Sequence, residues 1–259
     1  MVGLDGEARE RAALSAPESA VLMRGPRIGD RSTLALALKE LVARGYLGLD
    51  VAVEPRRFGG PKRSPVLTPG PIRGLVGNAV LDAVLEVLEG TRPSKARSTR
   101  QVVEEGVAQL LQPLGPRPSL RETLRTAVKT GWAGAEEPPA RTYPDGTVGV
   151  PVPILAEVVF RRYHHTGWIV LRTEGFVRGA VLPALVERGL YRPDRVPTSH
   201  GETTRAELEA RLGVRRRASA ERQIADGLRA LAPDADALDT AFAAIDRGVA
   251  RGWHVVYGD

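Results

Sequence analysis

The stretch Leu38-Lys39-Glu40-Leu41-Val42-Ala43-Arg44-Gly45-Tyr46-Leu47-Gly48-Leu49-Asp50 joins the end of an expected helix to the start of an expected strand. The glycine in its middle is expected in the left-handed conformation that ends helices. The residues from 46 to 53 alternate as in a half-buried strand. Four apolar residues upstream fall on one face of a helix: Leu34, Leu38, Leu41 and Val42. This stretch predicts a protein built from helix–glycine–strand units.

The middle of that stretch is a pentapeptide that recurs in close variants along the chain, at Val42–Tyr46, Val128–Trp132, Val186–Leu190 and Val249–Trp253. Each copy closes an amphipathic stretch, so all four glycines are expected to end a helix. The basic residue before the glycine in three copies suits the negative end of the helix dipole. The interval from Gly106 to Gly131 equals that from Gly227 to Gly252, which suggests a duplication. The alternative is a coincidence between helix pairs of similar length.

These patterns predict a mainly α protein, a helical bundle of amphipathic helices with short β-hairpins, in two related halves that resemble winged helices. The expected organisation is an N-terminal half with a basic hairpin at residues 1–136 and a C-terminal half at 154–259. A Pro- and Gly-rich linker at 137–153 separates them. Within the first half, Asp30 and Asn78 are expected to cap the helices that follow them.

Composition narrows the class of protein. The 259 residues have a net charge of +6 and a pI near 10.0, with no cysteine, which fits a reducing compartment. No apolar run reaches the roughly 20 residues of a membrane span, and no signal peptide precedes the first helix. We therefore expect a cytoplasmic protein with an anionic partner. An Arg-rich genome is the competing explanation of the charge.

Catalytic motifs are not apparent. The Gly-rich stretches match neither the phosphate-binding loop nor the dinucleotide fingerprint, and no pair of carboxylates stands out as an acid–base couple. The adjacent His164 and His165 point about 100° apart on a helix and lack further ligands at metal spacing. The sequence favours a protein that is not an enzyme and has no metal and no cofactor.

The segment between the first helix stop and Asn78 is the strongest candidate for function. It combines cations with one aromatic residue in a Pro- and Gly-rich hairpin, and the residues of interest are Arg56, Arg57, Phe58, Lys62 and Arg63. Such a loop suits a phosphate-bearing membrane surface, with Phe58 as the apolar contact. It also suits the wing of a winged helix lying along nucleic acid. An ordinary solvated loop is the third interpretation.

The order of these motifs over about residues 15–136 resembles the Golgi phosphoprotein 3 family. The matching parts are Leu38–Asp50, the basic hairpin, Gly77–Leu88, Thr91–Pro93 and Leu120–Gly131. The resemblance implies a mostly helical cytosolic protein that binds phosphatidylinositol 4-phosphate at membranes. For headgroup contacts it implies Arg31, together with Arg117 and Arg121 if the family's paired arginines are kept. Leu34 stands where the family has an arginine, and no tryptophan accompanies Arg31.

The same motifs are also similar to cytosolic winged-helix domains of certain bacterial predicted membrane proteins, through Arg44–Leu47 and Gly131-Trp132. That similarity implies a helical interaction module. The favoured hypothesis is a peripheral module that binds anionic lipid headgroups without catalysis. The alternative is a winged-helix module that binds nucleic acid or protein, and self-association into a homo-oligomer is a further expectation.

Overall fold

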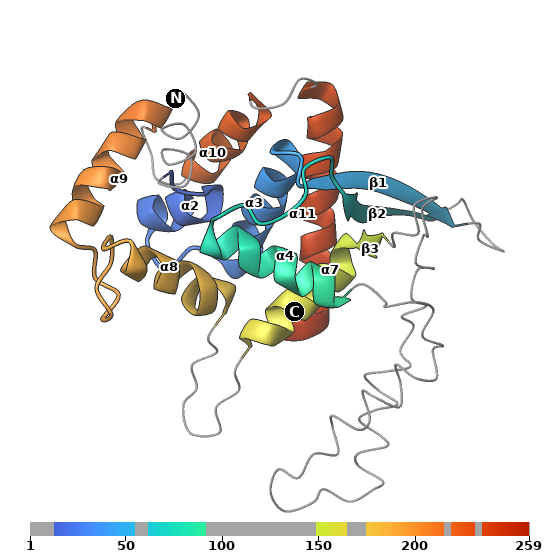
Figure 1. Ribbon diagram of the computed structural model, residues 1–259, viewed down its shortest axis with the longest axis horizontal. Helices are drawn as coiled ribbons and strands as arrows, with labels where there is room; N and C mark the ends of the chain where they lie inside the picture. Colours follow the sequence, from blue (N-terminus) through green and yellow to red (C-terminus); the bar gives the residue numbers. More distant parts are fainter. Residues whose placement is uncertain are drawn as a thin grey trace, which may run out of the picture.

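The computed structural model describes residues 13–54, 62–91, 149–164, 175–214, 219–230 and 235–258. It is mainly helical with one small antiparallel sheet, which confirms the predicted fold class (Figure 1). The helices are α2 (Ala16–Arg24), α3 (Asp30–Ala43), α4 (Ala79–Thr91), α7 (Val152–Tyr163), the π-helix η1 (Val177–Val181), α8 (Leu182–Glu187), α9 (Ser199–Leu212), α10 (Ala220–Arg229) and α11 (Ala235–Tyr257). The strands are β1 (Leu47–Glu54), β2 (Lys62–Pro69) and β3 (Val150–Pro151).

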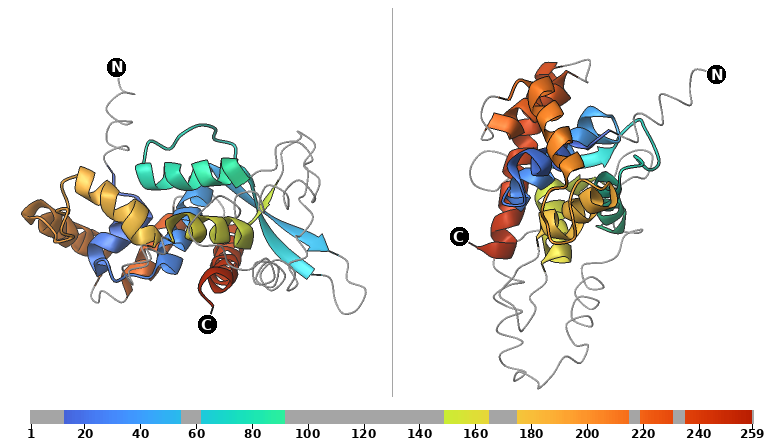
Figure 2. Two further views of the ribbon diagram at one scale, coloured as in Figure 1. Left: turned by 90° about the horizontal axis from the view of Figure 1, so that it is seen from below. Right: turned by 90° about the vertical axis from the view of Figure 1, so that its left-hand side faces the viewer.

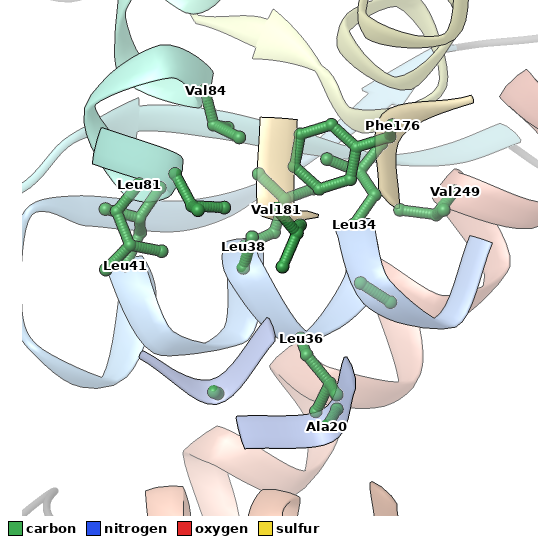
Figure 3. Close-up of a cluster of buried hydrophobic side chains, with 14 of the residues drawn as sticks. Ala20, Leu34, Leu36, Leu38, Leu41, Leu81, Val84, Phe176, Val181 and Val249 are labelled. Atoms are coloured by element: carbon green, nitrogen blue, oxygen red, sulfur yellow. The ribbon is translucent and has the colours of Figure 1, made fainter. Parts of the chain in front are cut away.

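Helix α3 forms the centre of the bundle. Every residue from Thr33 to Leu41 is buried, so the helix is covered on all sides after its first turn. Helices α2, α4, α10 and α11 all contact it. In Figure 3, Leu38 faces Val181, whereas Leu36 points the opposite way, towards Ala20. A helix that is buried all round belongs to the core rather than to the surface.

Strands β1 and β2 form a regular hairpin, with Leu47 opposite Pro69 and Glu54 opposite Lys62. Strand β3 adds to the other edge of β2, where Val150 lies opposite Leu67. The prediction of a linker at 137–153 is therefore wrong for its last residues, because 150–151 are a strand and α7 begins at Val152. Pairing with β2 satisfies backbone groups that a free linker would leave to water. The described helices of both predicted halves contribute to one continuous core.

Two of the predicted glycine stops are confirmed. Gly45 and Gly189 adopt left-handed φ angles of +79° and +69°. At the first stop, the Tyr46 amide donates to the Leu41 carbonyl at 2.9 Å and the Gly45 amide donates to the Val42 carbonyl at 3.0 Å. The stop at Gly189 repeats the same pair of bonds: the Leu190 amide donates to the Leu185 carbonyl and the Gly189 amide to the Val186 carbonyl, each at 2.9 Å. This pattern is the Schellman motif, which satisfies carbonyls left over at a helix end.

The predicted stop at Gly252 is wrong, because α11 continues through it to Tyr257. A Cβ atom at Gly252 would lie 2.6 Å from the Pro153 carbonyl oxygen and 2.7 Å from Ala156 Cβ. At Gly248, one turn earlier, it would lie 2.6 Å from a methyl of Val152. These two glycines therefore serve the close crossing of α11 over α7. The proposed duplication loses one matched helix end, and its counterpart at Gly131 lies outside the described residues.

The two predicted helix caps have different outcomes. Asn78 caps α4 as expected, since its Oδ1 accepts from the amides of Val80 and Leu81 at 3.1 and 3.2 Å. The cap of α3 is Gly29, and the prediction for Asp30 is wrong. The Asp30 carboxylate instead accepts the Val177 amide at 2.7 Å, so it ties the start of α3 to the start of η1. Burial raises the pKa of Asp30.

Candidate functional site

The structure separates the residues that the sequence grouped as one binding surface. Arg31 is exposed on the first turn of α3, whereas the hairpin leaves the opposite end of that helix. The 14-residue length of α3 puts about 20 Å between them. Lys62 and Arg63 are positions of β2, opposite Glu54 and Val53. Arg56, Arg57, Phe58, Arg117 and Arg121 lie outside the described residues.

A hollow between the hairpin and the last helix joins parts of the chain that are far apart in sequence. Its volume is about 320 Å³, and it is lined by Pro65, Ala244, Arg247, Gly248 and Arg251. The close crossing at Gly248 and Gly252 fixes α11 on α7, and α7 and α11 both contact β2. Pro65, in the middle of β2, therefore faces two arginines of α11. The hollow brings the strand that carries Lys62 and Arg63 next to a second basic element.

Among the described side chains, no carboxylate forms an ion pair with the cations of this hollow. Arg247 and Arg251 are exposed, and neither has an ion-pair partner in the ranges that the structure describes. The adjacent Asp246 is engaged elsewhere, because its carboxylate lies 2.7 Å from Lys39 Nζ. Other exposed arginines do have partners, such as Arg161 with Glu157 at 2.8 Å. The hollow is consequently a local excess of positive charge.

This arrangement can hold an anion. A guanidinium presents a planar set of donors that matches carboxylate and phosphate oxygens, and it remains charged at any physiological pH. Ala244, Gly248 and Pro65 supply an apolar floor between the two arginines. Sequence reasoning missed Arg247 and Arg251, although their four-residue spacing on the polar face of an amphipathic helix was a readable signal. Their proximity to β2 depends on tertiary packing, which no local pattern encodes.

A second charged cluster lies at the confirmed glycine stops and is built around two buried glutamates. The side chain of Glu18 is buried, and its Oε2 accepts from the Ser15 amide, the Ser15 hydroxyl and Asn78 Nδ2 at 2.7–2.8 Å. Arg188 Nε lies 2.9 Å from the other carboxylate oxygen. These contacts join α2, the start of α4 and the end of α8, so Glu18 holds three elements together.

Glu40 forms the other half of this buried cluster. Its Oε2 accepts the Ala16 amide at 2.6 Å, and its Oε1 lies 2.7 Å from a guanidinium nitrogen of Arg44. Burial raises the pKa of Glu40, while the Ala16 amide and Arg44 act in the opposite direction. The arginine before each confirmed stop thus pairs with a buried glutamate. Both carboxylates contact an arginine, although Glu18 Oε1 accepts no hydrogen bond from the described part of the chain and is neutralised by its ion pair with Arg188. The cluster therefore supports the fold by joining these elements.

Two further searches of the described residues concern other kinds of site. Within these ranges, no three His, Asp or Glu side chains converge as metal ligands. None of the described helices is both long and apolar enough to cross a bilayer.

Comparisons with protein-family models, with curated proteins and with solved structures find no match to this chain.

Proposed function

We propose that this protein is a peripheral, non-enzymatic module that binds anionic lipid headgroups at the base of its basic hairpin. The observation that supports this proposal is the hollow lined by Pro65 of β2 and by Arg247 and Arg251 of α11. In this proposal the two guanidiniums contact headgroup phosphates, and the hairpin cations Arg56, Arg57, Lys62 and Arg63 add to the attraction. Each cation near an anionic bilayer contributes about 1 kcal/mol of attraction.

The alternative of a winged-helix nucleic-acid module has weaker support. In that mode the helix before the hairpin lies in the major groove and needs an exposed face with side chains that reach base edges. That helix is α3, and its residues from Thr33 to Leu41 are all buried. Its first turn carries the exposed Arg31, and its last residues, Val42 and Ala43, are half-buried and apolar. Contact with a phosphate backbone through the hairpin remains a testable alternative.

Co-sedimentation with vesicles tests the proposal. Wild type is expected to pellet with vesicles of phosphatidylcholine that contain an anionic lipid, and to remain in solution with phosphatidylcholine alone. Binding should weaken as salt is raised. Charge reversal of Arg247 and Arg251 to Glu, or of the four hairpin cations, should reduce pelleting to the level on neutral vesicles.

A matched control separates the site from overall charge. Arg211 on α9 and Arg222 on α10 are exposed, and reversing both to Glu changes the net charge as much as the α11 reversal does. Pelleting of this control should fall far less than that of the α11 variant. Equal loss in both variants would point to non-specific attraction. The nucleic-acid alternative would be supported if wild type were retained on duplex DNA but bound anionic vesicles no better than neutral ones.

A further inference from the structure

The outward side of α11 continues the candidate site beyond the hollow. Arg247, Arg251 and Val255 follow one another at four-residue intervals, which places them on one stripe of the helix. All three are exposed, and Val255 keeps 58% of its surface accessible, a high value for a large apolar side chain. The stripe therefore carries two cations followed by one apolar residue that has no place in the core.

The other exposed residues of this helix side do not offset its charge. Ala243 and Asp239 continue the stripe towards the start of α11, and the Asp239 carboxylate is paired with Arg229. His254 is exposed beside Val255, and Asp246, at the edge of the stripe, is held by Lys39. A helix side with cations and an apolar residue, and with its acidic neighbours engaged, has the chemistry of a helix that lies in the plane of an anionic membrane.

We propose that α11 lies along the surface of an anionic bilayer, with Arg247 and Arg251 at the level of the phosphates and Val255 in contact with the acyl boundary. This orientation rests on the proposed function and goes beyond it, because it states which side of the protein meets the lipid. Electrostatic attraction brings the stripe to the bilayer, and burial of Val255 adds an apolar contribution that salt does not screen.

A second exposed apolar region makes the orientation testable. The connection between β2 and α4 exposes Leu75 at 77% and Ile72 at 46%. Its ends are fixed, since the Gly70 amide donates to the Tyr46 carbonyl at 2.9 Å and the Val76 amide donates to Asp82 at 2.7 Å. Figure 2 shows this connection and α11 on opposite sides of the molecule. A bilayer that contacts the α11 stripe therefore leaves Leu75 in water.

The chain contains no cysteine, so one introduced thiol reports one position. The experiment compares Val255→Cys with Leu75→Cys, each in the full chain and labelled with an environment-sensitive fluorophore. Vesicles contain phosphatidylcholine with or without phosphatidylglycerol, and a lipid with a spin label on its acyl chain serves as the membrane quencher. Val196→Cys, in the turn before α9, is a second control at an exposed apolar position.

The proposal predicts that only the label at 255 shifts to shorter wavelength on anionic vesicles and is quenched by the spin-labelled lipid. Co-sedimentation of each labelled protein is measured in the same samples. A protein that pellets without a change at 255, or with a change at 75 instead, overturns the orientation and leaves the proposed function standing. Failure of every labelled protein and of wild type to pellet overturns both.

Hydrogen exchange of the unlabelled wild type provides the same test without substitution. Peptides that cover residues 247–257 should gain protection on anionic vesicles, whereas peptides that cover 70–78 should not. The reverse pattern contradicts the proposal. Protection of 247–257 by duplex DNA but not by vesicles would assign the stripe to nucleic acid and would equally overturn it.

Discussion

The pentapeptides Val42–Tyr46 and Val249–Trp253 differ only in their last aromatic residue, yet they adopt different structures. The first ends α3 in a Schellman motif, with Gly45 at a φ of +79°. The second lies inside α11, which runs on to Tyr257. In the first, the glycine is needed for its backbone conformation. In the second, it is needed because α7 leaves no room for a side chain.

The arginines of the two pentapeptides also have different surroundings, because a different residue lies one helical turn before each of them. Glu40 precedes Arg44 by four residues, and the two form a half-buried ion pair at 2.7 Å. Arg247 precedes Arg251 by the same interval, so that two like charges share an exposed helix side beside the hollow. The same five-residue pattern therefore supports the fold at one place and lies on an exposed, positively charged helix side at the other.

The largest expected effect comes from removing each arginine in turn. Arg44→Ala leaves the buried Glu40 without its cation, and breaking a buried pair costs about 3 kcal/mol. Arg251→Ala removes an exposed side chain and should change the free energy of unfolding by less than about 0.5 kcal/mol. Urea unfolding monitored by circular dichroism measures both values. Equal effects in the two variants would contradict the different roles assigned to them.

The second largest effect on the free energy of unfolding is expected at Gly252, inside α11. Gly252→Ala forces a methyl group against backbone atoms of α7 at 2.6–2.9 Å, and overpacking of this kind costs about 1–3 kcal/mol. The matched control is Gly227→Ala in α10, where no atom lies within 4 Å of the new Cβ. That change should stabilise the protein by up to about 1 kcal/mol through helix propensity. A stabilising Gly252→Ala would show that the helices are not in close contact.

The two confirmed stops should respond through backbone strain. Gly45→Ala and Gly189→Ala each place a Cβ in the left-handed region, at a cost of about 1–2 kcal/mol. The two costs should be similar, because the nearest atom to the new Cβ at Gly45, Pro71 Cγ at 3.4 Å, makes an ordinary contact and Gly189 has open space. Gly189→Asn should recover part of the loss, since asparagine tolerates this conformation. Thermal unfolding of the four proteins, wild type included, ranks these effects.

The stops at Gly45 and Gly189 were predictable because a Schellman end is a local motif, and Asn78 was predictable as a cap for the same reason. Gly252 could not be told apart from them, because the contact that matters comes from α7, about 100 residues away. The hollow on α11 was missed for an equivalent reason. The two arginines can be read from the sequence, but their proximity to Pro65 of β2 cannot.

The smallest effect concerns pH. Burial raises the pKa of Glu40 above its ordinary value of 4.5, so the folded protein binds this proton more tightly than the unfolded chain does. The contribution of Glu40 to stability is therefore greatest below 4.5 and is lost as the pH rises through the raised pKa. As the pH rises through this range, wild type should therefore lose stability relative to Glu40→Gln. Arg247→Gln, the equivalent change in α11, should leave the pH profile in this range unaltered.

The most direct test of the account is the single substitution Arg247→Glu, which gives the second pentapeptide the acidic residue that precedes the first. A Glu four residues before Arg251 stabilises a helix by about 0.2–0.5 kcal/mol, so the folded protein should be at least as stable as wild type. Affinity for anionic vesicles should nevertheless fall roughly tenfold to thirtyfold, because one cation is lost and a second is neutralised. Vesicle binding that equals wild type, with the fold intact, would contradict the assignment of this surface to anionic lipid.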